Sequence, residues 1–421
     1  MSQTERHRIE RLGHQGDGVA PGPVYVARAL PGELVEGRRV GDRLEDMRIV
    51  EPSSDRVSPP CAHYRGCGGC ALQHASDEFV AGWKLDVVRQ ALKAQGLDAE
   101  FRDVITSPAQ SRRRAVIAAR RTKKGAMAGF YGRGSDVITE IPNCRLLAPE
   151  LVDALPLAEE LARLGASRKG ALAVTMTRTD NGLDVAVRGG KPVDTALRQD
   201  CATLAEAHGL ARISWEDEAL AMRLPPAQVF GGVPVSPPPG AFLQATREGE
   251  AALLACVEEI TRGARRVADL FCGSGTFTLP LAARAEVHGV EAEPEMLAAL
   301  DRGWRHGQGL RRVTTEARDL FRRPLMADEL SRFDAVVIDP PRAGARAQTE
   351  ALADAQVPVI AAVSCNPVSF ARDAAVLVAA GYRLQWVQVV DQFRWSTHVE
   401  LAAAFVLSHE TGRASEGQGT A

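Results

Sequence analysis

Cys365, Asp339 and Glu400 are the side chains of this sequence whose types and positions could do chemistry together. Cys365 stands in the run VSCNP and Asp339 in the run VIDPPR, and each run follows apolar residues typical of a buried strand. A thiolate is strongly nucleophilic even when only partly ionised at neutral pH, so Cys365 could add to an electron-poor carbon. A buried free thiol is the commoner role of a cysteine, but the position of Cys365 after a strand favours the nucleophile.

A base is needed beside such a nucleophile, and Glu400 in the run THVE is the candidate. The alternative for this residue is an exposed carboxylate at a strand end. Proline after an apolar strand ends the ladder of hydrogen bonds, and ligands of open α/β sheets bind at the carboxyl ends of the strands. We therefore expect Asp339 and Cys365 to face one cleft.

A glycine-containing run, DLFCGSGT from Asp269, follows another apolar strand and precedes a helical pattern. Gly273 and Gly275 would let the backbone turn tightly and approach a ligand closely. The next strand ends at Glu291, where a carboxylate could accept hydrogen bonds from ribose hydroxyls. A dinucleotide site would have a third glycine where this chain has Thr278, so we favour S-adenosylmethionine as the adenosine cofactor. A carboxylate that only ties down the loop is the alternative for Asp269.

Four of the eight cysteines form a separate group. Cys61, Cys67 and Cys70 have the spacing C-x5-C-x2-C, and Cys144 follows at a distance. Four thiolates could hold zinc or an iron-sulfur cluster. Three clustered ligands with one distant ligand favour a 4Fe-4S cluster, because structural zinc usually has paired CxxC knuckles. Cys201, Cys256 and Cys272 are expected to be ordinary thiols.

Three kinds of segment would position these residues. Residues 1–57 alternate apolar and polar positions between Gly and Pro, which predicts a small antiparallel barrel. Residues 58–239 contain the cysteines, an amphipathic helix ending at Gly96 and two β-hairpins. Residues 240–408 alternate strands and helices, which predicts a doubly wound α/β sheet, with a final antiparallel strand pair at its edge. Residues 409–421 are polar and expected to be disordered.

The composition narrows the class of protein. The chain has 421 residues, 51 Lys+Arg and 53 Asp+Glu, so any grip on nucleic acid must come from a local basic surface. The uncharged run 224–246 is long enough to span a membrane but contains six prolines, which excludes a membrane helix and favours a linker. The charged N-terminus is unlike a signal peptide. We therefore expect a cytoplasmic, reduced protein without disulfides.

A basic block from residue 110 to 135 is the expected nucleic-acid surface. It has eight Lys and Arg and no acidic residue, and it ends near Phe130 and Tyr131, which could stack on an unpaired base. A solvated charged hairpin is the alternative. Residues 1–57 have nine basic and ten acidic residues, so the barrel has no basic signature.

Together these runs resemble the S-adenosylmethionine-dependent RNA 5-methyluridine methyltransferases, most closely the iron-sulfur 23S rRNA (uracil-C5) branch. The resemblance covers the chain to about residue 407. RIERLGHQGDGVA resembles the TRAM barrel, and the cysteine group with GGCALQH resembles the 4Fe-4S ligands. The methyltransferase motifs are resembled by DLFCGSGTFTLPLA, VIDPPRAG, SCNPVSFARD and THVE.

The resemblance implies a role for each matched residue. Gln244, Phe271, Glu291 and Asp339 would contact the cofactor, Cys365 would be the nucleophile and Glu400 the proton acceptor. The chain departs from the family pattern at Thr246 and Thr276, where the family often has Asn. The implied substrate is a uracil in folded RNA, with 23S rRNA favoured, and the implied state is a monomer. A tRNA T-loop methyltransferase, an idle RNA-binding or ribosome-assembly factor, and a small-molecule or protein methyltransferase are the alternatives.

Overall fold

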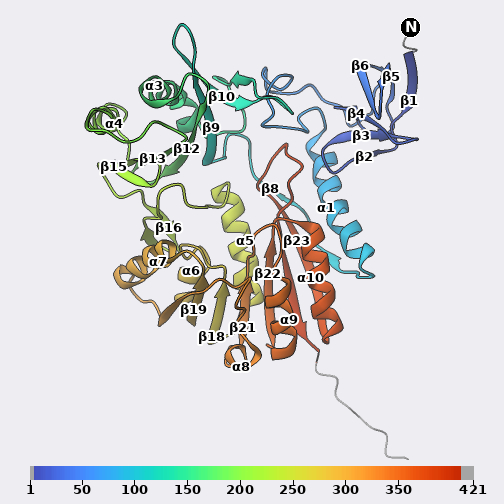
Figure 1. Cartoon of the computed structure of the whole chain (residues 1–421). Coiled ribbons are helices and arrows are strands. Elements are labelled where there is room, and N and C mark those ends of the chain that lie inside the picture. The colour runs from blue at the N-terminus through green and yellow to red at the C-terminus, as the bar shows by residue number, and fades with distance from the viewer. Residues whose placement is uncertain (1–3, 409–421) are drawn as a thin grey trace, which may run out of the picture.

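The structure is a computed structural model that describes residues 4–408, and it divides into three parts along the chain (Figure 1). In Figure 1 the N-terminal part lies at the upper right and the central part at the upper left, and the C-terminal α/β part lies below them. The tail expected at 409–421 is outside the described residues. In residues 4–408, no helix is long and apolar enough to cross a membrane.

The N-terminal part is the expected small β structure. Its six strands are β1 Thr4–Arg8, β2 Arg11–Leu12, β3 Asp17–Ala20, β4 Val24–Ala27, β5 Leu34–Val40 and β6 Arg43–Glu51. They are ordered β1-β5-β6-β4-β3-β2 in the sheet. Because β1 and β2 are the two halves of one bent segment, the sheet curls until its edges meet, around a core that includes Val24, Val26 and Val35.

The central part is a seven-stranded sheet covered by helices. The strands are β9 Arg114–Arg121, β10 Ala126–Tyr131, β11 Ile138–Glu140, β12 Ala171–Thr179, β13 Gly182–Arg188, β14 Arg212–Trp215 and β15 Glu218–Met222. The helices are α2 Pro149–Asp153, α3 Leu155–Gly165 and α4 Thr195–Ala207. Both predicted hairpins are confirmed, β9 with β10 and β12 with β13, and the turn of the second contains Asn181 and Gly182.

The C-terminal part is the predicted doubly wound sheet. Its strands are β18 Arg266–Leu270, β19 Glu286–Glu291, β20 Val313–Ala317, β21 Ala335–Ile338, β22 Val359–Ser364, β23 Tyr382–Asp391 and β24 Leu401–Leu407. Its helices are α5 Arg247–Ile260, α6 Thr278–Ala282, α7 Pro294–His306, α8 Ala327–Leu330, α9 Arg346–Ala355 and α10 Pro367–Ala379. Apolar clusters on both faces bury the parallel strands, which explains their continuous apolar sequences.

The strand order fixes where a ligand can bind. The order is β20-β19-β18-β21-β22-β24-β23, with β18 to β22 parallel and β24 antiparallel to both of its neighbours. The chain starts at β18, winds outward to β20 and then returns to β21 on the other side. The carboxyl ends of β18 and β21 therefore flank the switch point at which open α/β sheets bind ligands.

Elements from earlier in the chain complete this sheet. The predicted helix α1, Asp77–Ala94, packs against α10, while β7, Glu100–Phe101, and β8, Ile105–Thr106, pair with β23. The packing of the C-terminal part therefore crosses the boundary expected at residue 239. The proline-rich run contains a short hairpin, β16 Gln228–Phe230 with β17 Val233–Val235, which packs against α7.

Candidate active site

The glycine loop forms a tight turn between β18 and α6. Phe271, Gly273 and Gly275 have φ angles of 62°, 55° and 97°, a region that L side chains rarely occupy. A Cβ on Gly275 would lie 2.9 Å from Leu300 Cγ, so only glycine fits there. Gly273 N donates to Glu291 Oε2 at 3.0 Å. The carboxylate predicted to meet a ribose thus lies beside the loop and also holds its backbone.

Asp269 lies fully buried under this loop. Its Oδ2 accepts a hydrogen bond of 2.5 Å from Thr278 Oγ1, while Oδ1 is buried without a partner in the described part of the chain. Burial raises the pKa of Asp269 to about 7, against the lowering effect of the Thr278 hydroxyl. An orphaned carboxylate oxygen is costly, and a bound cofactor with a hydrogen-bond donor would satisfy it.

The loop offers an adenosine cofactor further suitable groups. The Phe271 ring packs against Phe321 with centroids 5.5 Å apart, and Phe321 is half exposed. An aromatic surface, a carboxylate at the end of β19 and backbone amides in a tight turn suit an adenosine, its ribose and a charged tail. The residues present therefore fit S-adenosylmethionine.

Cys365 follows β22 and stands two residues before α10. Asn366 caps that helix by accepting from Val368 N, and its Nδ2 donates to Arg342 O at 2.8 Å. This bond ties the segment after β21 to the one after β22. Burial is the largest cause that raises the pKa of the Cys365 thiol to about 11.

The two predicted carboxylates lie close enough to act on this thiol. The negative charges of Glu400 and Asp339 raise the pKa of Cys365 further, and the positive charge of Arg342 lowers it. Glu400 is only 3% exposed, and burial, followed by the charge of Asp339, raises its pKa well above the usual value. Desolvation raises the pKa of Asp339 to about 7. Cys365, Asp339 and Glu400 thus lie close enough for their charges to act on one another, and their roles in a reaction stay predictions.

Gln244 connects the site to the central part of the chain. Its Oε1 accepts from Gln392 Nε2 at 2.6 Å, and its Nε2 reaches Asp339 Oδ2 at 3.5 Å. Its backbone O accepts from Arg113 Nε at 3.0 Å. Thr246, a departure from the family pattern, is the N-cap of α5, since its hydroxyl accepts from Gly249 N.

Sequence reasoning missed two residues of this site, Gln392 and Arg342. Gln392 is 1% exposed and bonded to both Gln244 and Glu400. The polar pair Asp391 and Gln392, at the end of the apolar strand β23, could have indicated it. Arg342 belongs to the DPPR run, but only the fold shows that its charge lowers the pKa of Cys365.

The four predicted cluster cysteines gather in one region. Cys67 and Cys70 pack against the same apolar cluster as Cys144. Burial is the largest cause that raises the pKa of these three thiols, and the nearby Cys61 adds to the effect. Backbone amides donate to two of the sulfur atoms, Gly69 N to Cys67 and Leu146 N to Cys144. Across residues 4–408, however, no three His, Cys, Asp or Glu side chains form a group that could hold a metal ion. Thiols are suitable ligands for such a cluster, but the described residues do not bring them into a metal-binding group.

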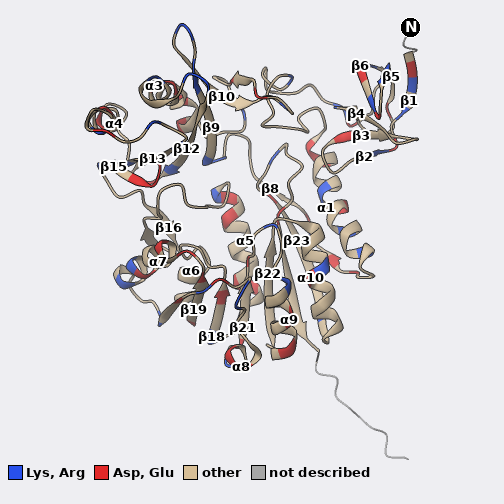
Figure 2. Cartoon of the chain, viewed as in Figure 1, with Lys and Arg blue, Asp and Glu red and all other residues tan. Residues whose placement is uncertain are grey.

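The basic block does not form one surface, which corrects the expectation from sequence. Arg113 is buried and pairs with Glu250 at 2.5 Å, and Arg133 pairs with Asp17 at 2.9 Å. The guanidinium of Arg114 donates to Gly240 O. These arginines hold the three parts of the chain together. The exposed charge lies on residues 121–124, at the tip of the β9–β10 hairpin, which is blue in Figure 2.

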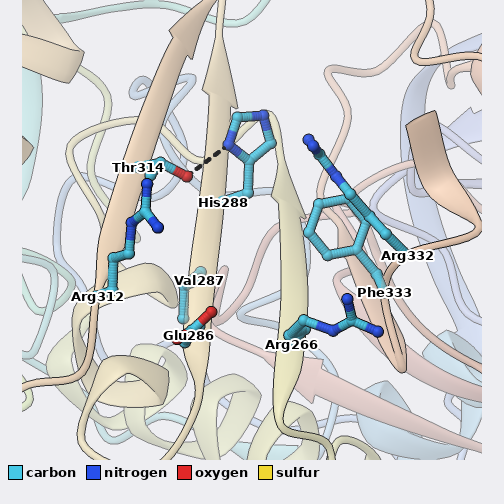
Figure 3. A pocket seen from close by; sticks show the side chains of 8 residues that line it. All are labelled: Arg266, Glu286, Val287, His288, Arg312, Thr314, Arg332 and Phe333. Carbon is cyan, nitrogen blue, oxygen red and sulfur yellow. Dashed lines mark hydrogen bonds between the residues drawn. The ribbon is translucent and has the colours of Figure 1, made fainter.

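A cavity of about 360 Å³ lies at the other end of the parallel strands, away from the glycine loop. Figure 3 shows its lining, in which three arginines surround a histidine bonded to Thr314 Oγ1. The arginines are Arg266, Arg312 and Arg332, and the histidine is His288. This cavity contains none of the predicted site residues, so its size does not locate the chemistry.

Comparison with known proteins gives the class first. The solved structure of Pyrococcus abyssi tRNA (uracil-54, C5)-methyltransferase in complex with S-adenosyl-L-homocysteine matches with a TM-score of 0.74. The match covers 95% of this chain and 99% of that chain at 23% identity, which shows a shared fold. The doubly wound sheet with its glycine loop therefore has the fold of an S-adenosylmethionine-dependent methyltransferase.

The sequence relatives give the family. A family model described as tRNA (Uracil-5-)-methyltransferase matches residues 308–408. An uncharacterized RNA methyltransferase of Brucella suis is 45% identical over 96% of this chain and 98% of its own length. The 23S rRNA (uracil(1939)-C(5))-methyltransferase RlmD of Chromohalobacter salexigens is 35% identical over 96% of this chain and 89% of its own. The chain belongs to the S-adenosylmethionine-dependent RNA 5-methyluridine methyltransferase family.

Proposed function

We propose that the protein methylates carbon 5 of one uracil in folded RNA, with 23S rRNA as the substrate. The observation that carries this proposal is the convergence of Cys365, Glu400 and Asp339 beside the glycine loop. The RlmD relative, which acts on 23S rRNA by its name, aligns over nearly the whole chain and favours rRNA. A tRNA substrate is the second candidate, because the full-length structural match is a tRNA enzyme.

Cys365 acts first in this proposal. Its thiolate adds to carbon 6 of the flipped-out uracil, so that electron density moves to carbon 5. S-adenosylmethionine, when bound, supplies the methyl group that carbon 5 receives. Asp339 and Gln244 hold the reacting groups in place. The two side chains meet in the site, where Gln244 Nε2 lies 3.5 Å from Asp339 Oδ2.

Glu400 completes the reaction. It accepts the proton from carbon 5, and the electron pair of that C–H bond re-forms the double bond and expels the Cys365 sulfur. A carboxylate with a raised pKa is a stronger base than an exposed one, so burial of Glu400 favours the transfer. The carboxylate must be ionised before the transfer, and the nearby charge of Arg342 lowers its pKa in that direction.

The RNA must be held while its base leaves the stack. Extrusion of a base costs a few kcal/mol, which contacts in the pocket offset. The exposed hairpin tip, with Arg121, Lys123 and Lys124, is the phosphate-binding surface that we propose. Replacing all three by Ala should lower RNA affinity and reduce the slope of log affinity against log salt by about 3.

We further propose that Cys61, Cys67, Cys70 and Cys144 hold a 4Fe-4S cluster. Four thiols and the N–H···S bonds from Gly69 and Leu146 suit such a cluster, which accepts hydrogen bonds at its sulfurs. Protein purified anaerobically should be brown and contain about four irons per chain. Colourless protein with stoichiometric zinc would overturn this assignment.

One assay tests the activity. Wild-type protein is incubated with labelled S-adenosylmethionine and with unmodified 23S rRNA, tRNA or free uridine, and 5-methyluridine is mapped. Methylation of one rRNA position is the expected result; methylation of tRNA alone would select the second candidate, and none at all would refute the proposal.

Cys365→Ser tests the nucleophile, with Cys256→Ser in α5 as the matched control because that buried thiol lies outside the site. The Cys365→Ser variant should lose turnover and the covalent complex with 5-fluorouracil-containing RNA, while Cys256→Ser keeps both. A surviving complex would show that the nucleophile is another residue. The expected monomer and cytoplasmic location stay predictions, which light scattering and cell fractionation test.

A further inference from the structure

Gln392 makes three hydrogen bonds at the centre of the site. Its Nε2 donates to Gln244 Oε1 at 2.6 Å and to Glu400 Oε2 at 3.2 Å. Its Oε1 accepts from the backbone N of Ala245 at 2.8 Å. The side chain is 1% exposed, so water does not compete for these bonds. The hydrogen-bonding capacity of the amide NH₂ is therefore divided between a cofactor-binding candidate and the proton acceptor.

The orientation of this amide is set by its surroundings. The Ala245 N–H can only donate, so the atom of Gln392 that faces it must be the oxygen. The NH₂ group then has to point toward Gln244 and Glu400. Gln244 receives a donor at its own oxygen, which leaves its NH₂ facing Asp339 Oδ2 at 3.5 Å. Each group thus donates to the next: Ala245 N to Gln392, Gln392 to Gln244, and Gln244 to Asp339.

We propose that Gln392 is a positioning residue, which fixes the carboxylate of Glu400 for proton transfer and turns the amide of Gln244 toward Asp339. The proposal rests on the proposed function, because it assigns Gln392 a part in the same reaction. Gln392 touches neither the uracil nor the methyl group in this account. It acts through Glu400 and Gln244, which are held by the two hydrogens of a single NH₂ group.

Gln392 is the neutral donor among charged neighbours of Glu400. The groups whose charges or hydrogen bonds act on Glu400 are Asp339, Arg342 and Gln392, and Cys365 feels the charge of Glu400 in return. A donor to the ionised form lowers the pKa of a carboxyl group, as Gln392 does here. Without this donor, burial and the charge of Asp339 still oppose the ionisation of Glu400, and only the charge of the exposed Arg342 favours it.

The position of Gln392 is fixed by its neighbours along the chain. The preceding residue, Asp391, forms a buried ion pair of 2.5 Å with Lys84 of α1, and Lys84 also donates to Phe393 O at 3.1 Å. Val390 N donates to Glu400 O at 2.8 Å. A side chain between two such anchors loses little entropy when it bonds, which suits it to hold others.

The test compares Gln392→Met with Gln388→Met. Met keeps the length of Gln and cannot donate. Gln388 is a matched control, because it is a buried glutamine of β23, four residues before Gln392, whose amide donates to Asp103 O and Val389 O, outside the site. Gln392→Met should lower kcat roughly 10- to 100-fold, the effect of losing a bond to a charged group, with KM for RNA changed little. Gln388→Met should keep the wild-type kcat.

Two further readouts separate positioning from mere packing. In Gln392→Met the acidic limb of the kcat–pH profile should move to higher pH, because Glu400 ionises less readily. The methylated covalent RNA complex should accumulate, since release of Cys365 waits for the proton transfer. Added to Glu400→Gln, Gln392→Met should cause a much smaller further loss, as residues acting through one group are not additive.

The outcomes are distinguishable. Wild-type kcat and an unshifted pH profile in Gln392→Met would overturn the positioning role, as would full additivity with Glu400→Gln. If Gln392→Met does not fold, Gln392→Glu is used instead, since Glu has the same size and replaces the donating NH₂ group by a carboxyl oxygen. Its pH optimum should move, and an unmoved optimum would overturn the proposal. Failure of the proposed function is a separate result, the absence of methylation by the wild type.

Discussion

The two ends of the parallel strands β18, β19 and β20 handle charge in opposite ways. At the carboxyl ends Asp269 is fully buried, with a pKa raised to about 7, and one of its oxygens is unpartnered in the described residues. At the amino ends of these strands and of the neighbouring β21, Arg266, Arg312 and Arg332 are exposed around an open cavity (Figure 3). Burial of an ionisable group is costly, whereas a solvated arginine costs little.

Function in this sheet is expected at the end where ionisable groups are buried. The arginine end has the cavity of about 360 Å³ and a concentration of charge, but each arginine there is stable in water without help. The acidic end keeps Asp269, Asp339 and Glu400 in an environment that opposes their ionisation. Burial of these carboxyl groups costs free energy and is not needed for folding, so it indicates a role in the reaction.

The largest expected effect is at the acidic end. Glu400→Gln keeps the shape of the side chain and removes the proton acceptor, so turnover should fall about 10²- to 10⁴-fold. Single-turnover assays with labelled cofactor measure this loss. The covalent complex with 5-fluorouracil-containing RNA should still form, because Cys365 is intact.

Glu350→Gln, on the exposed side of α9, is the control and should have wild-type turnover. Equal rates in Glu400→Gln and the wild type would remove Glu400 from the reaction and weaken the contrast between the two ends.

Arg342 should have a smaller effect than Glu400, through its charge, which lowers the pKa of both Cys365 and Glu400. Arg342→Met should reduce the rate at neutral pH by roughly 3- to 10-fold, a modest factor because the guanidinium is exposed and screened. The loss should shrink as the pH rises and the thiol ionises. A kcat–pH profile of this variant beside Arg346→Met, an exposed arginine four residues later, checks it; a loss independent of pH would contradict the charge effect.

Asp269→Asn should change stability with pH. The folded-state pKa of about 7 exceeds the usual aspartate value of 3.8, so folding favours the protonated form, and the wild type loses stability as the pH rises from about 4 through 7. The full difference is up to about 4 kcal/mol. Asn cannot ionise, so Asp269→Asn should be relatively more stable at pH 8 than at pH 5. Melting temperatures of both proteins from pH 4 to 8 measure this, and parallel curves would refute the buried charge.

The smallest effect is expected at the arginine end. Replacing Arg266, Arg312 and Arg332 by Ala should change methylation of a short stem-loop RNA by less than about twofold, since surface charges far from the reacting atoms act weakly. The same assay on a long rRNA fragment tests whether these arginines contact RNA outside the stem-loop. A tenfold loss with either RNA would show that this end also belongs to the functional surface.

Much of the fold could be predicted from local patterns. The apolar strands before Asp339 and Cys365 and the helix ending at Gly96 are visible in short windows, because burial on one or both faces leaves a period in the sequence. The doubly wound order then placed Asp339 and Cys365 at one edge. The addition of β7 and β8 to the C-terminal sheet could not be predicted, since two-residue strands leave no period.

Site residues could be predicted where the type of side chain implies a reaction. They were missed where the role depends on contacts that only the fold creates. Cys365 and Glu400 carry their chemistry in their side chains. Gln392 has an undistinguished type, and its part depends on bonds to Gln244 and Glu400, which are distant in sequence or follow after a turn. The basic block was wrongly predicted to form one RNA-binding surface, because the sequence does not show which charges are paired. Arg113, for example, pairs with Glu250, 137 positions away.

The ion pair between Lys84 and Asp391 sets the order in which the protein can be completed. The two residues are 307 positions apart, so the ribosome releases α1 long before β23 exists. Until then Lys84, Val88 and Leu92, which are buried in the finished protein, have no strand to pack against. Contacts of such separation form slowly, and a nascent chain needs protection meanwhile. A chain that ends before β23 therefore lacks both the strand that α1 contacts and the carboxylate that pairs with Lys84.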